Sequence, residues 1–258
     1  MSSFTFGCQT ITFGGDQKED FPAVFDAISD AGYDGVEIGF RHIQDVEPRK
    51  LKEMLDDADL SLLGTHLGGN LEDKAQADEE KKILDEVLEY IEPLGTGLIM
   101  YSGLRYGDAA QFKEEVEMLS RSAEHCREHG VSLCYHNHNW EFEDDGRVIR
   151  ALLDDASRAL GFCPDIGWVM KGGGDVLQFL KEAGDRVHTL HFKDFATDGE
   201  EVDTVVLGTG VAPLREAAWW AKSNMDGGWM VTEQDSAELP AGEAVRRNAD
   251  YLKKIFLD

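Results

Sequence analysis

Apolar and polar positions follow two alternating patterns along the chain. Short runs rich in β-branched and aromatic residues are followed by longer segments with helical spacing of apolar residues, as at Leu84, Val87, Leu88 and Ile91. The short runs predict strands over residues 4–12, 35–40, 61–67, 97–102, 131–138, 160–166, 187–193 and 228–234. The longer segments predict helices over residues 21–32, 47–58, 75–93, 109–129, 147–157, 174–184, 212–223 and 241–256. Eight strand–helix units indicate an α/β fold, a single (β/α)8 TIM barrel over residues 1–258.

Glycine-containing segments add detail to this pattern. Gly130 and Gly184 follow predicted helices and are expected to be left-handed caps. The connection over about 195–211 contains VVLGTG and is long, so we expect a substrate-side loop with a short extra strand. The GGG run at 172–174 precedes a helix but lacks a GxGxxG or GxxxxGK[ST] context. It predicts a flexible turn and not a nucleotide-binding loop.

Charge and composition indicate which binding partners and which cellular compartment to expect for this protein. The 51 acidic and 25 basic side chains give a formal net charge of -26, a field that repels nucleic acid and anionic membranes. The acidic residues are spread along the chain, which is typical of a halophilic-type surface, although an acidic mesophilic enzyme remains an alternative. The amino terminus MSSFTFGCQT has no targeting pattern, and no apolar run is long enough to span a bilayer. We therefore expect a cytoplasmic protein, whose four scattered cysteines are small buried residues.

Candidate metal ligands lie where the last four predicted strands end. In a parallel barrel the carboxyl ends of all strands share one face, so residues there converge in space. The segments concerned are VSLCYHNHNWEFE, GFCPDIGW, VHTLHFKD and WMVTEQD. They supply the four candidate ligands Glu141, Asp165, His191 and Glu233. Three carboxylates and one imidazole suit Mn, Mg, Co or Zn. Because most of these ligand atoms are oxygens, a closed structural zinc site is not expected.

Other residues at the same face are candidates for substrate contact. His66 in GTHLGG and Glu37 in GVEIGF are expected either to touch substrate or to support the ligands. Lys193 lies two residues after His191 and so points to the same side of its strand. It is expected to bind an anionic substrate oxygen or, alternatively, to form a salt bridge with Asp165 or Asp194. Trp140 and Trp168 are expected to wall the site for a sugar ring, or else to belong to the core.

The motifs GYDGVEIGF, GTHLGG, VSLCYHNHNWEF, FCPDIGWVMKGGGD, VHTLHFKDF, LGTGV and VTEQD resemble the xylose isomerase-like barrels over essentially the whole chain. This family includes sugar-phosphate isomerases and epimerases, inosose dehydratases and apurinic endonucleases. The resemblance implies one divalent metal ion, Mn being the first candidate, and Asp165, His191 and Glu233 match the family ligands. Many members have a glutamate on strand five where this chain has His136. Glu141 is preferred as the fourth ligand, His136 being the alternative.

The resemblance also implies the chemistry. We expect an isomerase or epimerase of a small sugar or cyclitol, which removes a proton next to a metal-polarised carbonyl. Glu233 is the first candidate base, with Lys193 or His66 stabilising the enediolate. In the alternative, a dehydratase or other lyase, His136 or His138 takes the proton. A nuclease is a remote alternative because of the charge, a non-catalytic barrel is a further one, and a homo-oligomer is left open.

Overall fold

The computed structural model describes residues 3–68, 77–198, 203–236 and 239–257. The predicted (β/α)8 barrel is confirmed. Eight parallel strands form one sheet in the order β6-β5-β4-β3-β2-β1-β10-β7, and two isolated bridges, Phe162–Val187 and Asp165–His191, join its edges. The strands of this sheet are β1 (Ser3–Gln9), β2 (Gly35–Gly39), β3 (Ser61–Gly68), β4 (Leu98–Ser102), β5 (Ser132–His136), β6 (Gly161–Cys163), β7 (Thr189–Phe192) and β10 (Gly227–Thr232).

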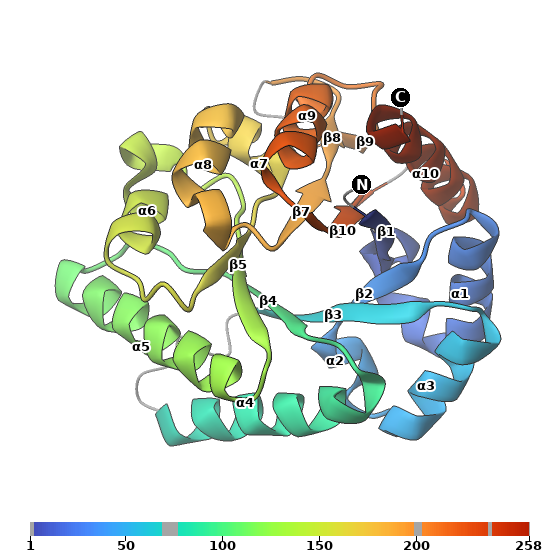
Figure 1. The fold of residues 1–258 in the computed structure, drawn as a ribbon, viewed down its shortest axis with the longest axis horizontal. Coiled ribbons are helices and arrows are strands. Elements are labelled where there is room, and N and C mark those ends of the chain that lie inside the picture. The colour runs from blue at the N-terminus through green and yellow to red at the C-terminus, as the bar shows by residue number, and fades with distance from the viewer. Residues whose placement is uncertain (1–2, 69–76, 199–202, 237–238, 258) are drawn as a thin grey trace.

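The helices surround this sheet as an outer ring, which Figure 1 shows from one end of the barrel. The main helices are α1 (Phe21–Asp30), α3 (Pro48–Asp57), α4 (Ala77–Ile91), α5 (Ala109–Glu128), α6 (Glu143–Asp154), α8 (Val176–Ala183), α9 (Leu214–Asn224) and α10 (Ala241–Leu257). Each corresponds to one predicted helix. Gly130 and Gly184 have positive φ angles of 74° and 55° after α5 and α8, as expected of residues that end helices.

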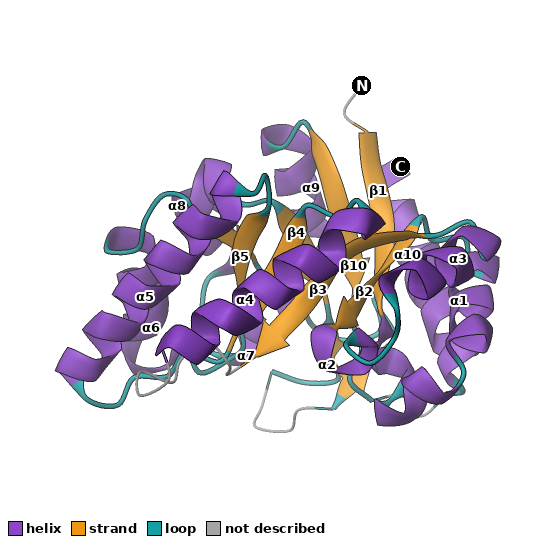
Figure 2. Ribbon diagram, turned by 90° about the horizontal axis from the view of Figure 1, so that it is seen from below, coloured by secondary structure: helices purple, strands orange, loops and turns teal. Residues whose placement is uncertain are grey.

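The structure also contains short elements that the periodicity did not predict, some of them at the carboxyl ends of the strands. The helices α2 (Phe40–Ile43) and α7 (Ile166–Lys171) follow β2 and β6, and Figure 2 shows both at the arrowhead side of the barrel. The 3-10 turns are η1 (Thr10–Phe13), η2 (Gly15–Glu19), η4 (Glu92–Leu94) and η5 (Gly184–Arg186). The expected extra strand is present, because β8 (Asp194–Phe195) pairs antiparallel with β9 (Thr204–Val205).

Apolar side chains fill both sides of the sheet. Inside the barrel, a separate cluster joins side chains from five strands, namely Leu63, Met100, Cys134, Cys163 and Val231, so the interior is a packed core and not a pore. The larger cluster lies between the sheet and the helices. All four cysteines are free and buried, as expected.

The glycine run before α8 forms a turn, as predicted, but its packing is tight. Gly173 has a φ of 78°, which favours glycine. A Cβ atom on Gly172 would lie 2.2 Å from the carbonyl oxygen of Asn139. The run therefore permits close approach to the segment after β5, which carries candidate site residues. None of the helices described here is both long and apolar enough to cross a bilayer.

Candidate metal centre and catalytic cavity

Four ionisable side chains from consecutive strands of the second half of the barrel converge at its carboxyl end. His136 is the last residue of β5, Asp165 follows β6, His191 lies on β7, and Glu233 directly follows β10. Each offers one ligand atom, and these atoms all lie within 4.8 Å of one another. All four side chains are buried. This set of four is called the metal group below.

Distances within the metal group are those of a compact cluster. His191 Nδ1 lies 2.6 Å from Glu233 Oε2, and His136 Nε2 lies 3.3 Å from the same oxygen. His136 Nε2 is also 3.6 Å from Asp165 Oδ2. Burial favours the neutral form of Glu233, yet the neighbouring Lys193, His136 and His191 outweigh it and hold the pKa of Glu233 well below its usual range. Glu233 is therefore ionised, as a metal ligand must be.

Two buried atoms without hydrogen bonds support the fit of a divalent cation to the metal group. Asp165 Oδ2 and His136 Nε2 are buried and make no hydrogen bond, although a buried polar atom without a partner costs about 1–3 kcal/mol. Two imidazole nitrogens and two carboxylate oxygens form a donor set that suits Zn, Mn or Co. A bound cation would satisfy both of these atoms at once.

Asp165 has a second task, which is to begin helix α7. Its Oδ1 accepts a hydrogen bond from the backbone N–H of Trp168 at 2.9 Å, so Asp165 caps the helix while Oδ2 faces the metal group. Helix α7 packs directly on β7, since a Cβ atom on Gly167 would lie 2.6 Å from the carbonyl oxygen of Lys193. The sequence DIGW thus fixes both the ligand and the helix behind it.

Glu141, the preferred fourth ligand in the sequence prediction, lies outside the metal group. Its Oε1 accepts a hydrogen bond from the hydroxyl of Tyr135 at 2.8 Å, and its Oε2 accepts one from the backbone N–H of His138 at 2.8 Å. Burial raises the pKa of Glu141 to about 7. Strand β5 ends at His136 and the chain then turns, so Glu141 points back at its own strand. His136, the alternative ligand, occupies the position beside Asp165 and Glu233.

Lys193 is buried among carboxylates. Its Nζ lies 2.7 Å from Asp235, 3.2 Å from Glu233 and 3.6 Å from Asp165. Burial alone would lower the pKa of Lys193, but Glu233, Asp165 and Asp235 raise it above its usual value. The contacts of Lys193 therefore match the alternative expectation of a salt bridge. Of the two expected partners, Asp165 is within reach of Lys193 and Asp194 is not among its ion pairs.

Glu37 also reaches this region, from β2. Its Oε2 lies 2.7 Å from Nε2 of His191, on the other side of the imidazole from Glu233. Its Oε1 lies 3.5 Å from Nδ1 of His66. Burial would raise the pKa of Glu37, but His191 and His66 outweigh it and lower that pKa to about 2.

A cavity of about 180 Å³ opens beside the metal group. Its lining is mostly polar and consists of Gln9, Ile11, Gln17, Gly39, Arg41, His42, His66, Gly68, Ser102, His138, Glu233 and Asp235. The predicted residues His66, His138 and Glu233 are therefore brought together, whereas Lys193 lies outside the lining. His66 Nε2 lies 2.9 Å from the hydroxyl of Ser102. His138 Nδ1 is buried and makes no hydrogen bond.

Aromatic side chains support His138. Its ring stacks on the Trp140 ring, with the two centroids 4.2 Å apart. The guanidinium of Arg105 lies over the same Trp140 ring, 3.8 Å from its centroid. Trp168 lies beneath the Lys193 ammonium at 4.9 Å. Burial, together with His136 and Lys193, lowers the pKa of His138 to about 2, so its imidazole is unprotonated at neutral pH.

Sequence reasoning missed several lining residues. Gln9 ends β1, Gln17 lies on η2, Ser102 ends β4, and His42 lies on α2. Uncharged polar residues in loops have no periodicity and are common everywhere, so no signal in the sequence separated Gln17 or Ser102 from surface residues. His42 lines the cavity because it lies on α2, a helix that the apolar pattern did not predict.

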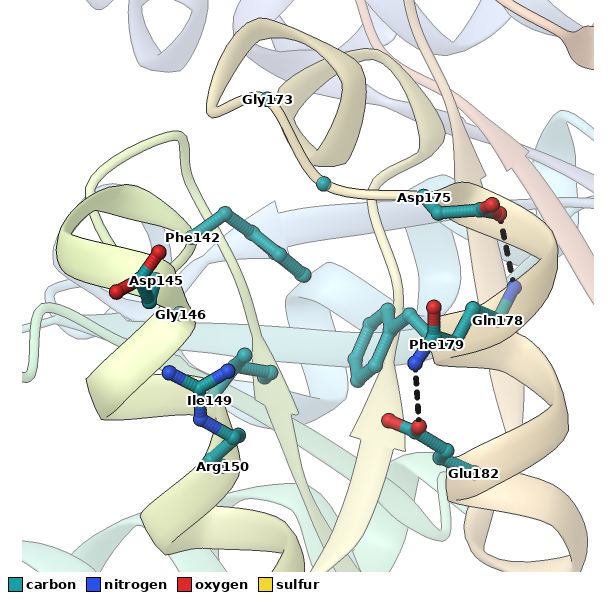
Figure 3. Close-up of a pocket in the computed structure, with 11 residues that line it drawn as sticks. Phe142, Asp145, Gly146, Ile149, Arg150, Gly173, Asp175, Gln178, Phe179 and Glu182 are labelled. Carbon is teal, nitrogen blue, oxygen red and sulfur yellow. Dashed lines mark hydrogen bonds between the residues drawn. The ribbon is translucent and has the colours of Figure 1, made fainter.

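A second cavity, of about 290 Å³, lies outside the barrel between α6 and α8. Figure 3 shows Phe142 and Phe179 pointing into it, with Asp145 and Arg150 at one side. Asp145 has a φ of 58°, a left-handed conformation that is uncommon outside glycine. None of its lining residues belongs to the metal group, so the chemistry of the site is assigned to the cavity at the carboxyl end.

Two curated relatives are inosose dehydratases. The one from Geobacillus kaustophilus is 25% identical over 193 residues, covering 68% of this chain and 62% of the relative, so the chain spans about three fifths of that protein. The one from Lacticaseibacillus casei is 23% identical over 269 residues, covering 90% of this chain and 88% of the relative.

Solved structures share the fold at low sequence identity. A sugar phosphate isomerase/epimerase from Parabacteroides distasonis has a TM-score of 0.82 at 20% identity and covers 98% of this chain and 97% of its own. The IOLI protein with a bound zinc atom has a TM-score of 0.80 at 16% identity, with 98% of both chains covered. Residues 25–255 match the family described as xylose isomerase-like TIM barrel. Because this match covers most of its length, the chain belongs to the xylose isomerase-like TIM barrel family.

Proposed function

We propose that this chain is a divalent-metal-dependent dehydratase that acts on a keto-sugar or a keto-cyclitol such as an inosose. The observation that supports it most is the state of His138, whose Nδ1 is buried beside the cavity without a hydrogen-bond partner. The other acid–base groups of the lining are engaged: Glu233 by His191, His66 by Ser102, Asp235 by Lys193 and His42 by Arg41. One free imidazole suits an elimination on one face of the substrate.

The metal would be held by Asp165, His191 and Glu233, as predicted, together with His136 in place of Glu141. When bound, a divalent cation supplies Lewis acidity that polarises a substrate carbonyl and acidifies the neighbouring C–H. Replacing one carboxylate by an imidazole shifts the preference from Mg toward Mn, Co or Zn. Mn remains the first candidate, with Zn supported by the donor set.

His138 would move the proton. Its Nδ1 takes the proton from the carbon next to the carbonyl, and the electron pair of that C–H bond forms a carbon–carbon double bond as the neighbouring C–O bond breaks. The same imidazole then gives its proton to the departing hydroxyl, which leaves as water. Stacking on Trp140 holds the ring in the required orientation.

Other residues would hold the substrate oxygens and the charges. His66, which contacts Ser102, would donate a hydrogen bond to the oxygen on which negative charge develops. Lys193 favours the ionised forms of Glu233 and Asp235 and holds both side chains in place, so we assign it no direct contact with substrate. Glu233 is held by His191 and Lys193, so we assign Glu233 to the metal and not to proton removal.

The isomerase or epimerase predicted from the sequence shares the first step. It differs in the fate of the proton, which returns to carbon, and inversion at a carbon needs a second base on the opposite face. The predicted base Glu233 lines the cavity, but His191 and Lys193 both hold it. This difference makes the two functions separable by experiment.

The test is to incubate the Mn-loaded or Zn-loaded protein with an inosose in deuterium oxide and to follow the products by mass spectrometry. We expect a product lighter than the substrate by one water. His138→Gln should lower kcat by about 10²–10⁴-fold, the usual contribution of a positioned acid–base group. His129→Gln, which alters an exposed histidine after α5, should leave kcat unchanged.

Two results would contradict the proposal. A product that has lost no water and carries one deuterium on carbon, and is therefore one mass unit heavier than the substrate, would identify an isomerase or epimerase. Dehydration that persists at the parental rate in His138→Gln would remove the role of this imidazole.

A further inference from the structure

Glu37 is a buried carboxylate on a strand that supplies no member of the metal group. It lies on β2 between Val36 and Ile38 and is fully buried. Burying a carboxylate in such surroundings is costly unless it is paired. The contact that pairs it is the one to Nε2 of His191, at 2.7 Å.

The two nitrogens of His191 face different neighbours. Nδ1 lies 2.6 Å from Glu233 Oε2, the oxygen that His136 also approaches, so Nδ1 faces the metal group. Nε2 faces Glu37. A neutral imidazole carries a proton on one nitrogen only, and a metal ligand must leave the other one free.

We propose that Glu37 is a positioning residue that keeps the proton of His191 on Nε2 and thereby presents Nδ1 to a divalent cation. The Nε2–H group donates to Glu37 Oε2, which fixes the tautomer and the plane of the ring and increases the basicity of Nδ1. The proposal rests on the metal-binding part of the proposed function and is independent of the reaction catalysed.

The second oxygen of Glu37 extends this effect to the cavity. Oε1 makes no hydrogen bond and lies 3.5 Å from Nδ1 of His66, whose Nε2 contacts Ser102. One carboxylate therefore lies between a member of the metal group and an imidazole of the cavity lining. Its removal is expected to loosen both rings, the His191 ring more strongly because its contact is shorter.

The experiment measures Zn²⁺ affinity by competition with a chromophoric chelator in the parent protein, Glu37→Gln and Glu37→Leu. Carboxylates behind a metal-binding histidine typically change metal affinity by about 10- to 100-fold, and we expect a loss of this size in Glu37→Leu and a smaller loss in Glu37→Gln. The amide oxygen of Gln still accepts from Nε2–H, so this variant should partly preserve the tautomer.

A spectroscopic readout separates positioning from a general effect on folding. In nitrogen-15 spectra of the metal-free parent, at a pH high enough for the His191 imidazole to be neutral, His191 should appear as the Nε2–H tautomer, and Glu37→Leu should show a mixture or the other tautomer. Glu115→Gln, which removes a buried carboxylate on α5 outside the barrel, is the matched control and should keep the parental affinity.

The proposal is overturned if both Glu37 variants bind Zn²⁺ within about threefold of the parent, if Glu115→Gln loses as much affinity as they do, or if the His191 tautomer is unchanged in Glu37→Leu. Because none of these readouts involves turnover, failure of the dehydratase proposal would leave this test intact.

Discussion

At the scale of single residues, the most unusual carboxyl group outside the metal group is that of Glu141. It is fully buried and its two oxygens accept hydrogen bonds from Tyr135 and from the backbone of His138. These bonds favour the ionised form, but the loss of hydration on burial outweighs them and raises the pKa to about 7. Protonation of Glu141 is thus linked to folding.

This linkage predicts a pH dependence of stability. The unfolded chain releases the Glu141 proton near pH 4.5 and the folded chain near pH 7, so the stabilisation from the bound proton is complete below about pH 4.5. This stabilisation decreases as the pH rises and is lost above about pH 7. Because each unit of pKa difference corresponds to 1.36 kcal/mol, the free energy of unfolding should change by about 3 kcal/mol in total. Urea denaturation of the metal-free protein at pH 5 and pH 7.5 measures it.

The variant Glu141→Gln imitates the protonated form and should remove most of this slope. Glu143→Gln, which alters an exposed carboxylate two residues along the chain, should keep it. Equal slopes in the two variants would show that Glu141 is not the group responsible.

Single residues also show how far the sequence alone can predict a site. Asp165, His191 and Glu233 directly follow or occupy apolar strand segments, so their convergence could be predicted from the barrel. The choice between His136 and Glu141 could not, because it depends on where β5 ends and which way the next residues turn. Glu37 was recognised as a candidate, but its contact with His191 joins strands that are distant in sequence, and periodicity contains no information on such a pair.

At the scale of elements, one carboxylate organises the loop after β7. Asp194 accepts hydrogen bonds from four backbone N–H groups, those of Phe195 and Ala212 on Oδ1 and those of Gly208 and Gly210 on Oδ2. The LGTGV segment is thus wrapped around a buried charge. The long connection was predicted from its length, but this organisation was not, because backbone donors are the same in every sequence.

Replacing Asp194 by Asn should unfold this arrangement in part. The amide NH₂ group would face two N–H donors, so at least two charge-assisted hydrogen bonds are lost, and we expect destabilisation of about 2–4 kcal/mol. Urea denaturation at constant m value measures it. Asp203→Asn alters an exposed carboxylate of the same loop and should change stability by less than about 0.5 kcal/mol. Similar losses in the two variants would contradict this account.

The short helices α2 and α7 illustrate why strand ends were predicted too long. The apolar residues Ile166 and Val169 continue the run of β6 in the sequence, yet they lie on α7 because Asp165 caps a helix there. A helix of four to six residues is too short to show a period of its own. Strand interiors and long helices could be predicted because each is long enough to repeat its own pattern of apolar residues.

At the scale of the whole molecule, the net charge of -26 dominates the electrostatics. Repulsion among surface carboxylates opposes the compact state, and salt screens it, since the Debye length falls from about 30 Å at 0.01 M to about 3 Å at 1 M. We therefore predict that KCl raises the melting temperature steadily at pH 7.5. The same titration near pH 4.5, close to the isoelectric point, should give a much smaller rise. Equal rises at both pH values would assign the effect to something other than net charge.

The barrel closes at a sparse seam. Strands β6 and β7 are joined through isolated bridges, one of which pairs Asp165 with His191, and both residues belong to the metal group. An ion held there would therefore cross-link the two edges of the sheet at the point where the barrel closes. The free energy of ion binding and the free energy of opening the barrel at this seam are then thermodynamically linked. A change that lowers the affinity for the ion also lowers the stability of the closed barrel.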